Sequence, residues 1–140
     1  MTRDDVLAVL AQLTDTRARR DWIAFGELYA ETVKVESPFA GSVVGREAVI
    51  RAQEAFYTAF PDIVITEDPP IIDGDRIAIV AEVAGTHVGD ILGLPPSGRA
   101  FRFQIAFILH LQDHLIAHER RLYDFTGLLV QIGVLRAKPA

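Results

Sequence analysis

One stretch constrains the fold of this chain more than any other, the segment from Phe101 to Leu111. It reads FRFQIAFILHL, with an apolar residue at every odd-numbered position. Side chains two positions apart share one face of an extended strand, whereas a helix would spread them around its axis. We therefore predict a half-buried β-strand with one face that is almost entirely hydrocarbon.

A second strand-length segment, from Ile116 to Tyr123, follows closely. Its ionisable side chains are those of His118, Glu119, Arg120, Arg121 and Tyr123. We interpret the two segments as a β-hairpin. The apolar strand would form the floor of a cavity, and the charged strand would supply polar groups to it.

The register of this hairpin decides which polar groups enter the cavity, because a shift of one residue sends every side chain to the opposite face. A loop of residues 113–115 pairs Phe107 with Arg121. The side chains that then share the cavity face are those of Glu119, Arg121 and Tyr123. A loop of residues 113–114 would instead place on that face His118, Arg120, Leu122 and Asp124.

Composition narrows the class of protein. The chain has 140 residues, of which 50% are hydrophobic and 24% charged, with a net charge of −5. This length predicts a single domain over residues 1–140, and the charge argues against nucleic acid or an anionic membrane as partner. No apolar run approaches the roughly 20 residues of a membrane span and no signal peptide is evident, so we expect a cytoplasmic protein. The lack of cysteine excludes disulfides and thiolate chemistry.

Helical periodicity occupies the first half of the chain. Apolar residues recur at helical spacing in three segments, Asp4–Leu13, Asp21–Ala30 and Arg46–Phe60. Thr2 is a candidate N-cap of the first helix, and Pro61 ends the third. A charged link, residues 15–20, separates the first two helices.

Strand periodicity follows from Asp62 onward, with a turn at Asp73–Gly74. Helices followed by long antiparallel strands are typical of an α+β domain. We predict a curved antiparallel sheet with about three N-terminal helices packed on one face. A last short helix is expected from Phe125 to Leu135, with Asp124 as its N-cap.

The loop from His87 to Arg99 reads HVGDILGLPPSGR. It resembles the His-x-Gly and Gly-x-Pro-Pro-Thr-x-Arg segment of the SnoaL-like polyketide cyclases, with Ser97 where threonine is usual. The family pattern Asp-x-x-Gly-x-x-x-Gln-x-Gly is matched after the hairpin by Asp124, Gly127, Gln131 and Gly133. The resemblance implies the cone-shaped fold of nuclear transport factor 2 and ketosteroid isomerase, in which a curved sheet and about three helices enclose an apolar pocket.

The resemblance also implies an activity. Cyclases of this family close a ring by intramolecular aldol condensation, using a hairpin Asp as acid/base and a nearby His, with no metal or organic cofactor. In this sequence the Asp position falls on Arg121 and the His position on Phe107. We favour the register that pairs these two residues, because it puts the family's functional position inside the cavity.

We therefore expect a cofactor-independent enzyme that carries out acid/base chemistry on a hydrophobic, oxygen-bearing small molecule, as a cyclase, isomerase or hydratase/dehydratase. A non-catalytic ligand-binding or dimerisation domain is the alternative, since both acid/base residues of the family are absent. An interaction module for another protein would lack the pocket altogether. The resemblance also implies a homodimer formed through the outer face of the sheet.

The candidate site residues have proposed roles. Arg121 would hold a carboxylate, enolate or phenolate, with Glu119 or Glu36 as its counterion. Glu119 or His87 would move the proton. The ligand would be oriented and enclosed by Trp22, Glu36, Phe103, Ile105, Phe107 and Tyr123.

Each of these residues also has a structural interpretation: a salt bridge for Arg121 and Glu119, a loop hydrogen bond for His87, and surface exposure for Glu36. Three histidines, His110, His114 and His118, would align on a helix as metal ligands, but the hairpin turn interrupts them. We expect no metal site.

Overall fold

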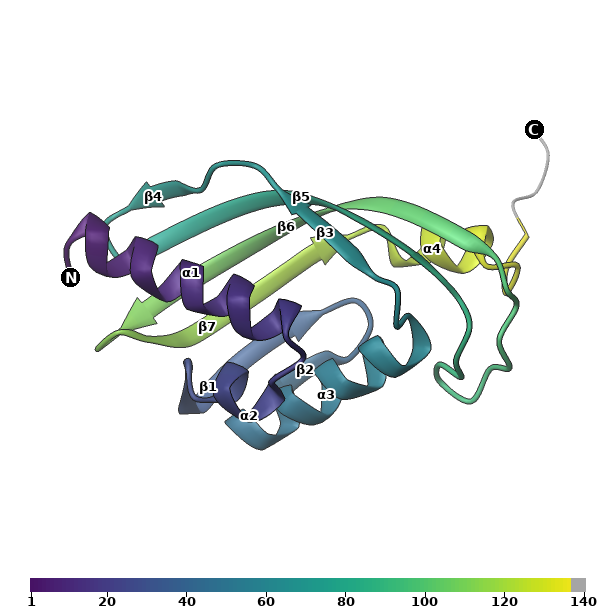
Figure 1. Cartoon of the computed structure of the whole chain (residues 1–140), viewed down its shortest axis with the longest axis horizontal. Coiled ribbons are helices and arrows are strands. Elements are labelled where there is room, and N and C mark those ends of the chain that lie inside the picture. The colour runs from purple at the N-terminus through teal and green to yellow at the C-terminus, as the bar shows by residue number, and fades with distance from the viewer. Residues whose placement is uncertain (137–140) are drawn as a thin grey trace.

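The computed structural model describes residues 1–136, and residues 137–140 of the predicted domain lie outside the described part. The helices are α1 (Arg3–Ala18), α2 (Trp22–Gly26), α3 (Arg46–Ala59) and α4 (Phe125–Gln131). The strands are β1 (Tyr29–Ser37), β2 (Gly41–Val44), β3 (Val64–Glu67), β4 (Ile71–Asp73), β5 (Arg76–Thr86), β6 (Ala100–Gln112) and β7 (Leu115–Tyr123). Figure 1 shows α1, α2 and α3 gathered on one side of a curved sheet.

The strands form one curved, unclosed sheet in the order β2-β1-β7-β6-β5-β3, and β4 also pairs with β5. This confirms the predicted α+β class with helices packed against a curved sheet. One pairing departs from the antiparallel pattern, because β1 and β7 run parallel. The chain between these two strands includes α3 and most of the sheet, and such a long connection permits parallel neighbours.

The first two helices differ from their predicted lengths. α1 continues to Ala18, because Thr16 and Arg17 are buried and extend the inward face beyond Leu13 by one turn. α2 ends at Gly26, and Tyr29 and Ala30, which we predicted as the end of this helix, instead begin β1. Tyr29 pairs with Ile116 of β7, so sheet formation overrides the helical spacing there.

Two predicted helix caps are confirmed. The Thr2 hydroxyl accepts a hydrogen bond from the Asp5 backbone N–H at 3.1 Å, at the start of α1. The Asp124 carboxylate accepts one from the Gly127 N–H at 2.8 Å, at the start of α4. Asp124 therefore has a structural role at the junction between β7 and α4.

The β6–β7 hairpin combines a two-residue turn with a bulge. Asp113 and His114 form the turn, with φ angles of 51° and 65° that suit the right-handed twist of the strands. The predicted three-residue loop is therefore wrong. The register nevertheless shifts by one residue between His110 and Leu111, because Ala117 is left without a partner on β6. The bulge restores the predicted pairing of Phe107 with Arg121.

Candidate functional site

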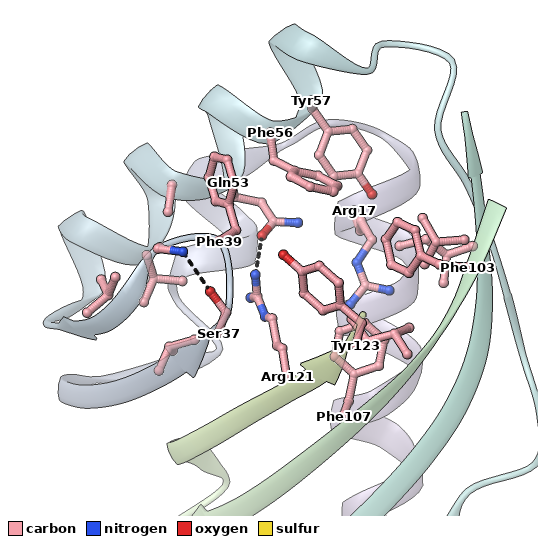
Figure 2. Close-up of a pocket in the computed structure, with 18 residues that line it drawn as sticks. Arg17, Ser37, Phe39, Gln53, Phe56, Tyr57, Phe103, Phe107, Arg121 and Tyr123 are labelled. Carbon is pink, nitrogen blue, oxygen red and sulfur yellow. Dashed lines mark hydrogen bonds between the residues drawn. The ribbon is translucent and has the colours of Figure 1, made fainter. Parts of the chain in front are cut away.

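A cavity lies between the inner face of the hairpin, helix α3 and the segment that joins β1 to β2 (Figure 2). It contains about 720 Å³ of atom-free space, its open mouth included. Much of its wall is aromatic or aliphatic, and it includes the predicted residues Phe103, Ile105 and Phe107. The polar lining residues are Arg17, Ser37, Gln53, Tyr57, Arg121 and Tyr123.

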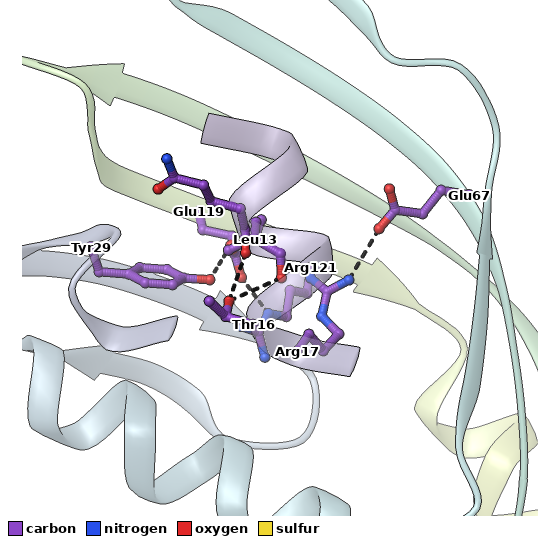
Figure 3. Close-up of polar contacts among 8 residues, drawn as sticks. Leu13, Thr16, Arg17, Tyr29, Glu67, Glu119 and Arg121 are labelled. Atoms are coloured by element: carbon purple, nitrogen blue, oxygen red, sulfur yellow. Dashed lines mark hydrogen bonds and ion pairs between the residues drawn. The ribbon is translucent and has the colours of Figure 1, made fainter. Parts of the chain in front are cut away.

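Arg121 reaches the cavity from β7 and is fixed by two acceptors. Its Nε donates to the Glu119 carboxylate, and its Nη1 donates to Gln53 Oε1 at 3.1 Å. Glu119 is 1% exposed and also accepts a hydrogen bond from the Tyr29 hydroxyl at 2.8 Å (Figure 3). Glu119 does not line the cavity. It holds Arg121 from behind, which is the counterion role we considered for it.

This network favours a charged Arg121 and a neutral Tyr29. Burial alone lowers the pKa of the Arg121 guanidinium, but the negative charge of Glu119 and the hydrogen bond to it raise that pKa by more. Burial and then the charge of Glu119 raise the pKa of the Tyr29 phenol. Arg121 is therefore a permanent positive charge at the cavity wall.

A second arginine, Arg17, enters the cavity from α1. Its Nη1 donates to Glu67 Oε1 at 3.0 Å, and its guanidinium carbon lies 5.5 Å from the ring centre of Phe107. The sequence interpretation placed Arg17 in a charged link between helices. The sequence does contain a signal for the burial of Arg17, because Leu13 lies one helical turn earlier on the buried face of the same helix.

Two tyrosines complete the polar lining. In Figure 2 the hydroxyls of Tyr57 and Tyr123 point into the same space as the two guanidinium groups. Burial raises the pKa of both phenols, that of Tyr123 to about 12. At neutral pH both are therefore hydrogen-bond donors rather than bases.

Besides Glu119, three predicted site residues lie outside the cavity lining, namely His87, Trp22 and Glu36. His87 is fully buried, where its Nδ1 accepts from the Ser97 N–H at 3.1 Å and lies 3.0 Å from Ser97 Oγ. It thus anchors the 87–99 loop. Trp22 packs against Phe25 and Tyr57, with ring centres 5.5 and 4.8 Å away, and does not line the cavity.

Glu36 requires a correction. Val35 and Ser37 line the cavity, so Glu36 between them points to the opposite face of the sheet. There it accepts a hydrogen bond at 2.8 Å from His118 Nε2. Glu36 is therefore neither a ligand contact in the cavity nor the counterion of Arg121.

Several cavity residues were missed at the level of sequence because they come from separate elements. They are Arg17, Ser37, Phe39, Gln53, Phe56 and Tyr57. Within residues 1–136 there is no group of three or more His, Asp or Glu side chains that could hold a metal ion. In the same range, no helix has the length and apolarity needed to cross a bilayer.

The sequence profile of the SnoaL-like polyketide cyclases matches residues 7–132 of this chain. The protein belongs to the SnoaL-like polyketide cyclase family. Members of this family bind small hydrophobic ligands.

Individual relatives support this assignment. The chain is 39% identical over 49 residues to aklanonic acid methyl ester cyclase AcmA of Streptomyces galilaeus. That match spans 35% of this chain and 34% of AcmA, so about a third of each protein is compared.

Two solved structures share the whole fold. AclR of Streptomyces galilaeus superposes with a TM-score of 0.82 at 20% identity, over 99% of this chain and 91% of AclR. TsrD of Streptomyces laurentii gives a TM-score of 0.82 at 24% identity, over 96% of this chain and 99% of TsrD. At these identities the likeness establishes the fold alone.

Proposed function

We propose that this protein is a cofactor-independent cyclase or isomerase that stabilises an enolate or similar oxyanion of a hydrophobic substrate with Arg121. The observation that carries the proposal is the position of Arg121, held by Glu119 and Gln53 at the wall of an apolar cavity. A positive charge fixed in advance in such a site stabilises negative charge that develops during reaction.

The proposed chemistry differs from that of the family members with a hairpin Asp. Among the described residues, the cavity lining contains neither a carboxylate nor an imidazole. Both oxygens of Glu119 are already occupied, by Tyr29 and by Arg121. The substrate would therefore have to be a carbon acid, such as a β-dicarbonyl compound, that ionises to solvent once Arg121 lowers its pKa.

The tyrosines would assist the second half of the reaction. The enolate carbon attacks a carbonyl carbon of the same molecule, and the new alkoxide takes a proton from solvent at the open mouth. Tyr57 and Tyr123 donate hydrogen bonds to the carbonyl oxygen on which this charge develops. The aromatic wall holds the chain folded so that the two reacting carbons meet.

Proton exchange on a simple β-keto ester tests the proposal. Wild-type protein should accelerate exchange of the acidic methylene protons of methyl benzoylacetate in D₂O, followed by NMR. Arg121→Met should reduce this acceleration by about 100- to 1,000-fold, the usual effect of removing an oxyanion donor. Arg120→Met, on the outer face of the same strand, is the matched control and should retain it.

A non-catalytic ligand-binding domain is the second candidate, favoured by the replacement of both family acid/base positions by Phe107 and Arg121. It predicts saturable binding of methyl benzoylacetate without any acceleration of exchange. Homodimer formation and a cytoplasmic location stay predictions. Sedimentation at micromolar concentration tests the first of them, since a monomer alone would contradict it.

A further inference from the structure

Arg17 is a second buried arginine in the same cavity, and its surroundings differ from those of Arg121. Its side chain is 9% exposed and lies against the aromatic rings of Phe25 and Phe107. Its ion-pair partner Glu67 lies on β3 with a side chain that is 25% exposed. The guanidinium thus meets its counterion on one side, lies beside two aromatic rings, and also borders the cavity.

The hydrogen bonding of Arg17 is incomplete. Its Nη1 donates to Glu67, whereas its Nε is buried and has no acceptor among the described residues. The edge formed by Nε and Nη2 presents parallel N–H groups that match the two oxygens of a carboxylate. Arg121, by comparison, already uses Nε on Glu119 and Nη1 on Gln53.

The two arginines therefore suit different parts of one ligand. Figure 2 shows both guanidinium groups directed at the space that Tyr57 and Tyr123 also face. Arg121 is held rigidly by its two acceptors, as a site for charge that develops during reaction requires. Arg17 has a free edge, and a ligand carboxylate there would satisfy a donor that is otherwise buried without a partner.

We propose that Arg17 binds a substrate carboxylate, so that the natural substrate is a hydrophobic free acid rather than its ester. This rests on the proposed function, since it assumes that the reacting part of the ligand lies at Arg121. The relative AcmA is named for a methyl ester. Esterification removes the negative charge and one strong acceptor, so a site built around Arg17 discriminates against the ester.

A matched acid and ester measure this discrimination directly. The probes are para-hydroxyphenylacetate and its methyl ester, which share a phenol for Arg121 and differ only at the carboxyl group. Wild-type protein should bind the acid about 10- to 100-fold more tightly, as expected for charge-assisted hydrogen bonds. Binding is followed by ligand-detected NMR at neutral pH.

Three variants test whether Arg17 causes the preference for the acid over the ester. Arg17→Met should bind acid and ester equally, with the affinity for the ester unchanged, whereas Arg17→Lys should keep part of the preference because it keeps the charge. Arg19→Met removes an exposed arginine next to α1 and should keep all of it. Circular dichroism verifies folding, and Arg17→Lys keeps the test valid if Arg17→Met does not fold.

The outcomes separate this inference from the proposed function. Equal binding of acid and ester by wild-type protein, or no binding of either probe, would overturn the role of Arg17. An acid preference as large as that of wild type in Arg17→Met, or in Arg17→Lys if Arg17→Met does not fold, would overturn it too. Arg121→Met reports on the proposed function instead, through the exchange of methyl benzoylacetate. If that exchange does not depend on Arg121 while Arg17→Met abolishes the acid preference, the proposed chemistry fails and the carboxylate site stands.

Discussion

Alternate residues of β7 form two ionic networks on opposite faces of one sheet. On the inner face Arg121 pairs with Glu119, with side chains 18% and 2% exposed. On the outer face Arg120 lies 4.0 Å from Glu36, with side chains 53% and 40% exposed. The residue types are the same, and only their access to water differs.

This difference determines what each pair can do. Water screens the outer pair, so its members contribute little and can be replaced singly. The members of the inner pair are hydrogen-bonded to protein groups instead of water. Removal of either member therefore leaves an unpaired buried charge. The inner pair can thus hold a guanidinium in one orientation at the cavity, as a binding or catalytic group requires.

The largest effect is expected from removing the inner carboxylate. Glu119→Leu leaves Arg121 charged and without its counterion, and should reduce the free energy of unfolding by about 3–5 kcal/mol. Glu36→Leu, its outer-face counterpart, should cost much less, because water screens the exposed pair. Urea denaturation measures both.

The double variant Glu119→Leu/Arg121→Met should recover most of the stability lost in Glu119→Leu, because no unpaired charge remains in the interior. Equal effects of Glu119→Leu and Glu36→Leu would show that the inner pair is solvated, and the contrast between the two faces would be lost.

A smaller effect is expected from the hydroxyl that supports Glu119. Tyr29→Phe removes a hydrogen bond to a buried carboxylate and should cost about 1.5–3 kcal/mol in unfolding free energy. His118→Ala removes the corresponding contact to Glu36 on the outer face and should cost much less, because water screens this contact. A loss in His118→Ala as large as that in Tyr29→Phe would contradict the comparison.

The three tyrosines allow the burial of the inner face of the sheet to be tested by changing the pH. Burial raises the pKa of Tyr29, Tyr57 and Tyr123, and no other tyrosine is present. The unfolded chain therefore ionises first, so stability is complete below about pH 10 and falls as pH rises toward about 12, the pKa of Tyr123. Phenolate absorbance at about pH 10 should be smaller in the folded protein than in urea, where it is half-developed.

The smallest expected effect is on the outer face. The hydrogen bond from His118 lowers the pKa of Glu36 below its ordinary value of 4.5. The contact therefore stabilises the folded protein at pH values above 4.5, and this stabilisation is lost as the pH falls through the lowered pKa of Glu36. NMR titration of the Glu36 carboxyl should give a midpoint below 4.5 that rises in His118→Ala. An unchanged midpoint would mean that the contact does not persist in solution.

Local sequence patterns were sufficient for the elements that identify the fold. The alternation in β6 predicted a half-buried strand, and Thr2 and Asp124 cap their helices as expected. The two-residue turn was considered but not favoured, because the bulge that compensates for it has no clear signature in the sequence. The pairing of Phe107 with Arg121 was still predicted, because the family resemblance favoured the register that puts position 121 inside the cavity.

Within the site, the same patterns placed the residues of the hairpin and misplaced those of other elements. Arg121, Tyr123 and Phe107 line the cavity as the register predicts. Glu36 was assigned to the wrong face, because a short strand with weak alternation does not indicate which side is buried. Its pairing with β7 settles the question only in the folded protein.

The sequence by itself determined which face of β6 is apolar, and the resemblance to the SnoaL-like family favoured the register that puts Arg121 in the cavity. Only the tertiary structure decided what surrounds it. Gln53 is 68 residues and Tyr29 is 90 residues away in sequence from the groups they bind, and Arg17 arrives from the first helix. Local periodicity indicates whether a side chain is buried but not which residues it contacts. Those contacts form only when distant elements pack together and remove apolar surface from water.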